Sequence, residues 1–457
     1  MTTHTKRPSV NTAMRRIAVI ATLAAGLGCS TTEIVTVETP DIVDPENVQT
    51  PNGANAVRIG ALARLNFAAS GEESLFLLGG LFADEFNNGD SFIARQEIDR
   101  RSITPENTFL LAANRVLHRT IVGAQQAIDV LTQYAPDAPA WHVAEMYFVQ
   151  AYAMNQIAEH YCDGIVFSSV QGGTEEYGMP IAATAAFELA LQKATDGLAL
   201  ITGTTTNDVR VQNALRLMRG KILLNLNRPA EAATAVTAVP TSYQYVLLHS
   251  PNTQSNNFWL FNNSARRYSV SNNEGGNGLN FATAADPRVP VCLGGTAACT
   301  AVGVTTANRD DQSQPLYVQT LWTTNSTSVA ILRGVEARMI EAEAQLRANN
   351  SAGALATINA ARTTVTGLAP LLDAGTAAAR VDQLFRERAF WMFGRGTRVG
   401  DLRRLVRQYQ RPANTVFPVG NYHKGGAYSA DVNIPVPLQE SNNPNVGTGG
   451  TCLNRDA

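Results

Sequence analysis

The stretch from Leu332 to Leu405 constrains the fold most, because apolar side chains recur in it at helical spacing through three consecutive segments. The first segment carries one apolar stripe, formed by Leu332, Val335, Met339, Ala342 and Leu346. Asn349-Asn350-Ser351 ends this segment and can cap the next, which repeats the pattern at Leu355, Ile358 and Ala361. A third helix follows, with an inner side formed by Val381, Leu384, Phe385, Ala389 and Met392. The stretch therefore predicts a helical hairpin and one further helix.

A second segment, 209–239, resembles the same unit, and its pattern is that of a tetratricopeptide hairpin. Alanines in the 332–362 unit let two helix backbones approach closely. One such hairpin cannot bury its outer face alone, so neighbours of the same kind are expected. We therefore predict a mainly α fold in which tetratricopeptide-like hairpins form an α-superhelical scaffold over residues 53–239 and 332–410.

Residues 240–331 interrupt this scaffold with a segment that is rich in Asn, Ser, Thr and Gly and has no helical period. Binding residues concentrate on loops held by rigid elements, so this insertion is the predicted ligand-facing region. Aromatic rings offer apolar faces to sugar rings, and polar side chains can bind hydroxyl groups. The candidates are Trp259, Asn262, Asn263, Arg267, Tyr268 and Trp322. The alternative for each aromatic residue is that it anchors the insertion to the helices underneath.

Two groups of short motifs near the carboxy terminus carry a family resemblance. The first group is Glu387-Arg388, Gly396, Arg398, Asp401-Leu402 and Arg404, and the second is Asn433-Ile434-Pro435-Val436-Pro437, Glu440 and Asn443-Pro444-Asn445. In this order, after a helical hairpin, they resemble the signature of the SusD/RagB family of bacterial surface lipoproteins. Trp391 and Arg395 stand where many members carry glutamate, which indicates a divergent branch.

The resemblance implies one SusD-like domain over residues 53–457, with 411–457 as its closing segment. It also implies a lipoprotein on the outward face of the outer membrane that caps a SusC-like TonB-dependent transporter. Such a protein captures an oligosaccharide, or another nutrient oligomer, and hands it over with no bond broken and no cofactor. The helical hairpins would then contact the transporter, and the insertion would face the ligand.

Phe92 joins the candidates because family members place ligand contacts in a loop of its region. It follows Asn87-Asn88-Gly89-Asp90, a cluster that is typical of an exposed loop. A polar run with aromatic residues inside it can hold a polar ligand, and the alternative is that it binds a neighbouring protein.

The amino terminus has the pattern of a targeting segment. Basic residues precede an apolar run from Ile17 to Leu27, which is shorter than the ~20 residues of a membrane-spanning helix. Gly26-Leu27-Gly28-Cys29 resembles a lipobox, so we expect a signal peptide over 1–28, lipidation at Cys29 and a polar tether over 29–52. The alternative is an ordinary signal peptide with an unrelated cysteine.

The four remaining cysteines are an even number in a chain expected to be exported, where disulfides persist. Cys292 and Cys299 enclose a short flexible loop, so we expect them to bond to each other. Pairing of Cys162 with Cys452 then follows by elimination.

The sequence also argues against several other classes of protein. A net charge of -2, a charged fraction of 16% and the lack of a basic stripe argue against nucleic-acid binding. The sequence contains no recognisable catalytic or phosphate-binding motif and no zinc-site spacing, so we expect no enzyme, no metal and no cofactor. Charged residues near the third helix are interpreted as ion pairs (Glu387, Arg388, Arg398 and Asp401) or as a solvated or ion-paired face (Arg403, Arg404 and Arg407). The alternatives are a structural cell-envelope protein that binds another protein through its helical repeats, and a hydrolase with an unfamiliar site.

Overall fold

The computed structural model describes residues 48–457 apart from 172–173, 448–451, 453 and 457. The predicted signal peptide, Cys29 and most of the predicted tether therefore lie outside the described residues. Among the described residues, the first long helix is α3 (Pro51–Ser70), which begins at the end of that tether. Its start is fixed by Thr50, whose hydroxyl accepts a hydrogen bond from Gly53 N at 3.0 Å, a typical helix cap.

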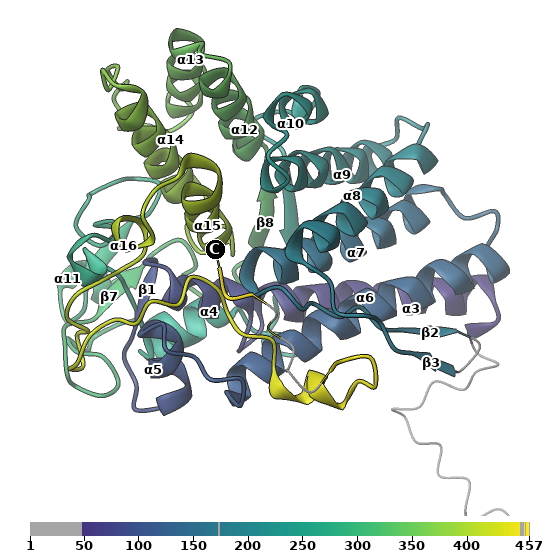
Figure 1. Ribbon diagram of the computed structural model, residues 1–457, viewed down its shortest axis with the longest axis horizontal. Helices are drawn as coiled ribbons and strands as arrows, with labels where there is room; N and C mark the ends of the chain where they lie inside the picture. Colours follow the sequence, from purple (N-terminus) through teal and green to yellow (C-terminus); the bar gives the residue numbers. More distant parts are fainter. Residues whose placement is uncertain (1–47, 172–173, 448–451, 453, 457) are drawn as a thin grey trace, which may run out of the picture. The chain divides into compact units, whose positions relative to one another are not determined.

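Successive helices pack side by side to form the scaffold, as Figure 1 shows. Their bounds are α6 (Thr108–Tyr134), α7 (Trp141–His160), α8 (Ala183–Leu200), α9 (Thr206–Asn225) and α10 (Pro229–Val236), and α3 packs against α6. Thr205 and Asp208 form a capping box at the start of α9. Gly220 lets α9 approach α10 closely, since a Cβ at this position would lie 2.3 Å from Val236 Cγ1. The mainly α prediction is confirmed.

The stretch that was expected to form a hairpin and a third helix does so, but it also contains a fourth helix and begins in a strand. The helices are α12 (Gly334–Arg347), α13 (Ser351–Arg362), α14 (Ala377–Trp391) and α15 (Arg398–Tyr409), and α10 packs on α12. Leu332, which was counted in the first helical stripe, belongs instead to strand β8 (Val329–Arg333). The strand forms because residues 329–333 pair with β4 (Gln244–Leu247), a contact that helical spacing cannot reveal.

Short strands connect the insertion to the helices. Among the described residues, the strands form two-stranded antiparallel sheets: β1 (Phe86–Asn88) with β5 (Tyr268–Val270), β2 (Ser169–Gln171) with β3 (Thr174–Glu176), β4 with β8, and β6 (Val291–Leu293) with β7 (Tyr317–Gln319). The β4–β8 pair brings the two ends of the insertion together. The β1–β5 pair joins its middle to the segment after α4 (Leu75–Phe82). The β4–β8 pair therefore closes the insertion at its ends, and the β1–β5 pair ties its middle to the segment after α4.

The closing segment packs back on the helices, as expected from its apolar alternation. Ile434 N donates to His160 O, and Cys162 N donates to Ile434 O, both at 2.8 Å. The side chains of Ile434 and Val436 are buried. Both expected disulfides are present: Cys162–Cys452 joins the end of α7 to the carboxy-terminal tail, and Cys292–Cys299 closes the short loop.

The charged residues around α14 and α15 form buried ion pairs. Arg388 pairs with Asp401, Arg404 pairs with Asp401 and Glu343, and Arg398 pairs with Asp84 at 2.6 Å. Glu387 accepts from Arg288 and Arg362. The ion-pair interpretation is thus confirmed for these residues. The expected solvated or ion-paired face is wrong for Arg403, which is buried and donates to backbone carbonyls at the end of α7. Within the described residues, no helix has the length and apolar composition to cross a membrane.

Candidate ligand-binding site

Phe92 lies at the surface, at the start of α5 (Ile93–Asp99), and 48% of its area is exposed. Asp90 holds this turn, because its carboxylate accepts from Phe92 N at 2.9 Å and pairs with Arg95 at 2.6 Å. The preceding Asn87-Asn88-Gly89-Asp90 cluster is buried, which corrects the expectation of an exposed loop. Its burial follows from the pairing of β1 with β5, a strand 180 residues further along.

The Phe92 ring has charged neighbours from the insertion. The guanidinium carbon of Arg267 lies 5.4 Å from the ring centroid, and Arg267 Nε is 4.0 Å from Asp310 Oδ2. Arg95, which is buried, approaches the same ring at 5.3 Å. We call the surface formed by Phe92, Arg267 and Asp310 the Phe92 surface. It combines an exposed apolar ring with hydrogen-bond donors and acceptors, which is the composition that a polar ligand with apolar faces requires.

Trp259 is half-buried and opens the π-helix η1 (Trp259–Ser264). Its backbone N–H is bonded to Asn256 Oδ1 at 3.2 Å, which fixes the start of this turn. Of the predicted contacts, Phe92, Trp259 and Arg267 therefore keep side-chain area at the surface.

The other predicted contacts are buried, and their role is packing. Trp322 is only 3% exposed and stacks on Phe258, with ring centroids 4.4 Å apart. Tyr268 is buried against Phe86 and Phe261. A ligand on the surface does not reach these rings, so the anchoring alternative applies to both.

Asn262 and Asn263 are buried as well, and they bind backbone groups of the insertion. Asn262 Nδ2 donates to Tyr268 O at 2.7 Å and to Tyr317 O at 3.0 Å, and its Oδ1 accepts from Gln319 N at 2.8 Å. Asn263 bonds to the side chain of Gln319. Irregular backbone that is buried needs such partners for its polar groups, which explains why these asparagines point inward.

A polar cluster lies beneath β1, where His423 stands between two carboxylates. His423 Nδ1 is 3.3 Å from Glu274 Oε1, and Tyr422 OH donates to Asp99 at 2.9 Å. Burial opposes the charge on His423, but its hydrogen bond to Glu274 and the charges of Asp99 and Glu274 outweigh that effect and raise its pKa. Burial likewise opposes the charge of Glu274, and the His423 hydrogen bond and charge still lower its pKa to about 2. This cluster supports β1 and is shielded from a surface ligand.

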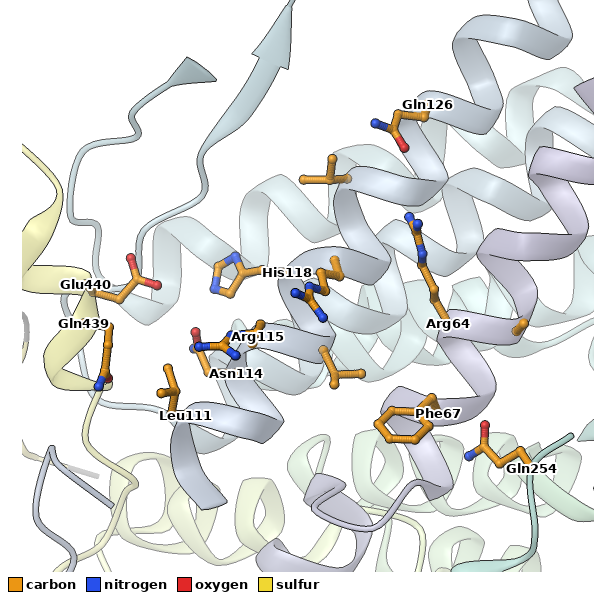
Figure 2. A pocket seen from close by; sticks show the side chains of 14 residues that line it. Arg64, Phe67, Leu111, Asn114, Arg115, His118, Gln126, Gln254, Gln439 and Glu440 are labelled. Atoms are coloured by element: carbon orange, nitrogen blue, oxygen red, sulfur yellow. The ribbon is translucent and has the colours of Figure 1, made fainter. Parts of the chain in front are cut away.

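A groove that the sequence did not reveal runs along α6, as Figure 2 shows. Its volume is about 860 Å³. Arg64 and Phe67 come from α3, Arg115 and His118 come from α6, and Glu440 comes from the closing segment. The signal that could have indicated it is the spacing of Arg115 and Arg119 on the outer side of α6, but the contributions of α3 and of residues 439–440 depend on tertiary packing.

We compared the chain with families of known sequence and with solved structures to identify its fold. No family sequence model and no curated protein sequence matches the chain. Solved structures do match it. A SusD superfamily protein from Parabacteroides distasonis superposes with a TM-score of 0.64 at 14% identity, over 87% of this chain and 98% of the other. A SusD-like carbohydrate binding protein from Bacteroides fragilis gives 0.63 at 12% identity, over 88% and 99%.

A further SusD-like carbohydrate binding protein, from Bacteroides vulgatus, gives a TM-score of 0.58 at 12% identity, over 77% of this chain and 83% of the other. The chain therefore has the fold of the SusD superfamily.

Proposed function

We propose that this chain is a cell-surface lipoprotein that captures an oligosaccharide, or another nutrient oligomer, and delivers it to a SusC-like TonB-dependent transporter in the outer membrane. The observation that carries the proposal is the SusD-superfamily fold, since two of its solved relatives are carbohydrate-binding proteins by name. The function is binding and transfer, in which no bond of the ligand is broken.

The Phe92 surface is the proposed contact region for the ligand. An exposed aromatic face can cover the C–H face of a sugar ring, and the charged groups of Arg267 and Asp310 can bond to hydroxyls at its edge. Trp259, which is half-buried, is the second aromatic residue proposed to contact the ligand. The remaining parts of the proposal are lipidation of Cys29 and contact of the helical scaffold with the transporter.

The test is isothermal titration calorimetry of the purified protein against a panel of neutral oligosaccharides. Phe92→Ala is expected to weaken the binding that the panel reveals by about tenfold, since loss of one aromatic contact and its burial removes roughly 1.5 kcal/mol. Tyr177→Ala is a matched control, because Tyr177 is also 48% exposed and belongs to the segment after β3. Equal losses in both variants, or no loss in Phe92→Ala, would reject this surface.

A second experiment addresses the transporter. The protein is expected to copurify from outer-membrane extracts with a large barrel protein, and the complex is expected to survive Phe92→Ala. If the protein copurified with a partner but bound no glycan or peptide, ligand capture would be rejected in favour of a structural cell-envelope protein that binds another protein.

A further inference from the structure

The groove between α3 and α6 is lined by arginines whose positive charges are not paired with acidic residues in the described part of the chain. Arg64, Arg115 and Arg119 line it, and none of them forms an ion pair or hydrogen bond with a described residue. Arg404, by contrast, is buried and pairs with two carboxylates. Three cations without partners in one groove indicate a site for anions rather than a stabilising network.

The other titratable groups in the groove do not cancel this charge. Burial lowers the pKa of His118 to about 4, so its ring is neutral at neutral pH. Among the described residues that line the groove, Glu440 is the one acidic residue, and burial raises its pKa. One carboxyl group does not balance three arginines. The groove is therefore net positive at neutral pH.

The three arginines are arranged along one side of α6. Arg115 and Arg119 are four residues apart, so their side chains lie on neighbouring turns of the same face. Arg64 comes from α3 and lies over Gly123, where a Cβ would be only 2.3 Å from Arg64 Nη1. Gly123 therefore provides the space that this guanidinium occupies. From residue 115 to residue 123 the charges cover about 12 Å of helix.

The uncharged residues of the groove indicate which class of anionic ligand it can bind. Phe67 is 46% exposed, and Figure 2 shows its ring in the groove near Gln254. The amides of Asn114, Gln126 and Gln439 line the same groove and can both donate and accept hydrogen bonds. A small inorganic anion would not use an exposed ring or a row of amides. A chain of sugar rings that carries acidic groups would use all three kinds of contact.

We propose that this groove binds an acidic oligosaccharide, whose carboxylate or sulfate groups pair with Arg64, Arg115 and Arg119 while one sugar ring covers Phe67. Planar guanidinium groups match such anions with two parallel hydrogen bonds. The proposal rests on the proposed glycan capture for its class of ligand, but it uses a surface separate from the Phe92 surface and names the charge of the ligand.

The test compares a hexamer of galacturonic acid with its methyl ester, in which each carboxylate charge is replaced by an uncharged ester, by calorimetry with the purified protein. The acid is expected to bind at least tenfold more tightly than the ester at low salt, and its affinity is expected to fall as salt screens the charges. A sulfated oligosaccharide of similar length then shows whether carboxylate or sulfate is preferred.

The double variant Arg115→Gln/Arg119→Gln is expected to lose about tenfold or more in affinity for the acid, because each arginine contributes charge-assisted hydrogen bonds. The variant with lysine at both positions keeps the charge and is expected to recover part of this loss. Arg380→Gln is the control, since Arg380 is paired with Asp373 away from the groove, and it is expected to bind as the unaltered protein does. Thermal unfolding verifies that each variant is folded.

Equal affinity for the acid and the ester, or full affinity in the double glutamine variant, would overturn the proposal. Binding to phosphatidylglycerol vesicles without binding to the acidic hexamer would also overturn it, since the groove would then recognise a membrane surface. If neutral glycans bind through Phe92 and acidic glycans do not bind, only this inference fails. If acidic glycans bind through the arginines and Phe92→Ala changes nothing, the Phe92 surface fails and the groove remains.

Discussion

The helical scaffold from α6 to α10 and the insertion over residues 240–331 are stabilised in different ways. In the scaffold, apolar and small side chains line the helix interfaces, and the backbone hydrogen bonds are satisfied within each helix. The insertion has little regular structure, so it buries aromatic rings and uses side-chain amides to bind its own backbone. Rings and amides in this irregular segment therefore serve its internal packing before they serve a ligand.

The largest expected effect comes from the ring that packs the insertion. Trp322→Ala is expected to lower the free energy of unfolding by about 3–5 kcal/mol, because it opens a cavity next to Phe258. Trp259→Ala, the half-buried counterpart from the same insertion, is expected to cost clearly less. Urea denaturation of both variants measures the difference. Similar losses would mean that the two rings are equally buried in solution.

The next largest loss of stability is expected when a buried side-chain amide of the insertion is removed. Asn262→Ala is expected to cost about 2–3 kcal/mol, since it leaves the carbonyls of Tyr268 and Tyr317 without their donor. Asn252→Ala is a suitable control, because Asn252 is exposed in the same insertion and donates only through its backbone N–H. Urea denaturation gives both values. A loss below about 0.5 kcal/mol for Asn262→Ala would show that water replaces these bonds.

The scaffold can be tested at a helix contact. Gly220→Ala is expected to cost about 1–3 kcal/mol, because the new methyl group meets Val236 and Ile340. Gly60→Ala is a matched change on α3, where a Cβ meets no atom within 4 Å, and it is expected to stabilise the protein by about 0.5–1 kcal/mol. Effects of the same sign in both variants would contradict close packing of α9 against α10 and α12.

The smallest expected effect is a pH dependence at the cluster that supports β1. The pKa of His423 is raised in the folded protein. The stability that its pair with Glu274 contributes is therefore fully present below the unfolded pKa of about 6.5, and it is lost as the pH rises through the folded pKa. Glu274 has a pKa of about 2, so it stays ionised throughout this range. His423→Gln is expected to reduce the loss of stability between pH 6 and pH 9 by about 1 kcal/mol, the contribution of one hydrogen bond. Denaturation at several pH values measures it, and an unchanged pH profile would contradict a charged His423.

Local patterns predicted the scaffold well because its contacts are close in sequence. The predicted scaffold range 53–239 contains α6 to α10, and the Asn349-Asn350-Ser351 stop gave the turn between α12 and α13. The motif order also indicated the fold, although overall identity to the solved structures is only 12–14%.

The candidate site was predicted less well because burial in the insertion depends on distant residues. Asn88 became buried when it paired with Tyr268, and Leu332 became a strand residue when it paired with Tyr245. The groove depends on residues from α3, α6 and the closing segment, which no single stretch of sequence displays together. Phe92 lies at the surface on the turn that Asp90 holds, so its role as a ligand contact stays a prediction.

The bond between Cys162 and Cys452 spans 290 positions and encloses everything from α8 to α15. In an exported chain, this ring can close only after all of those helices have crossed into an oxidising compartment. Oxidation of this pair would thus report the completion of export, and a molecule stalled in translocation would retain a free thiol at Cys162.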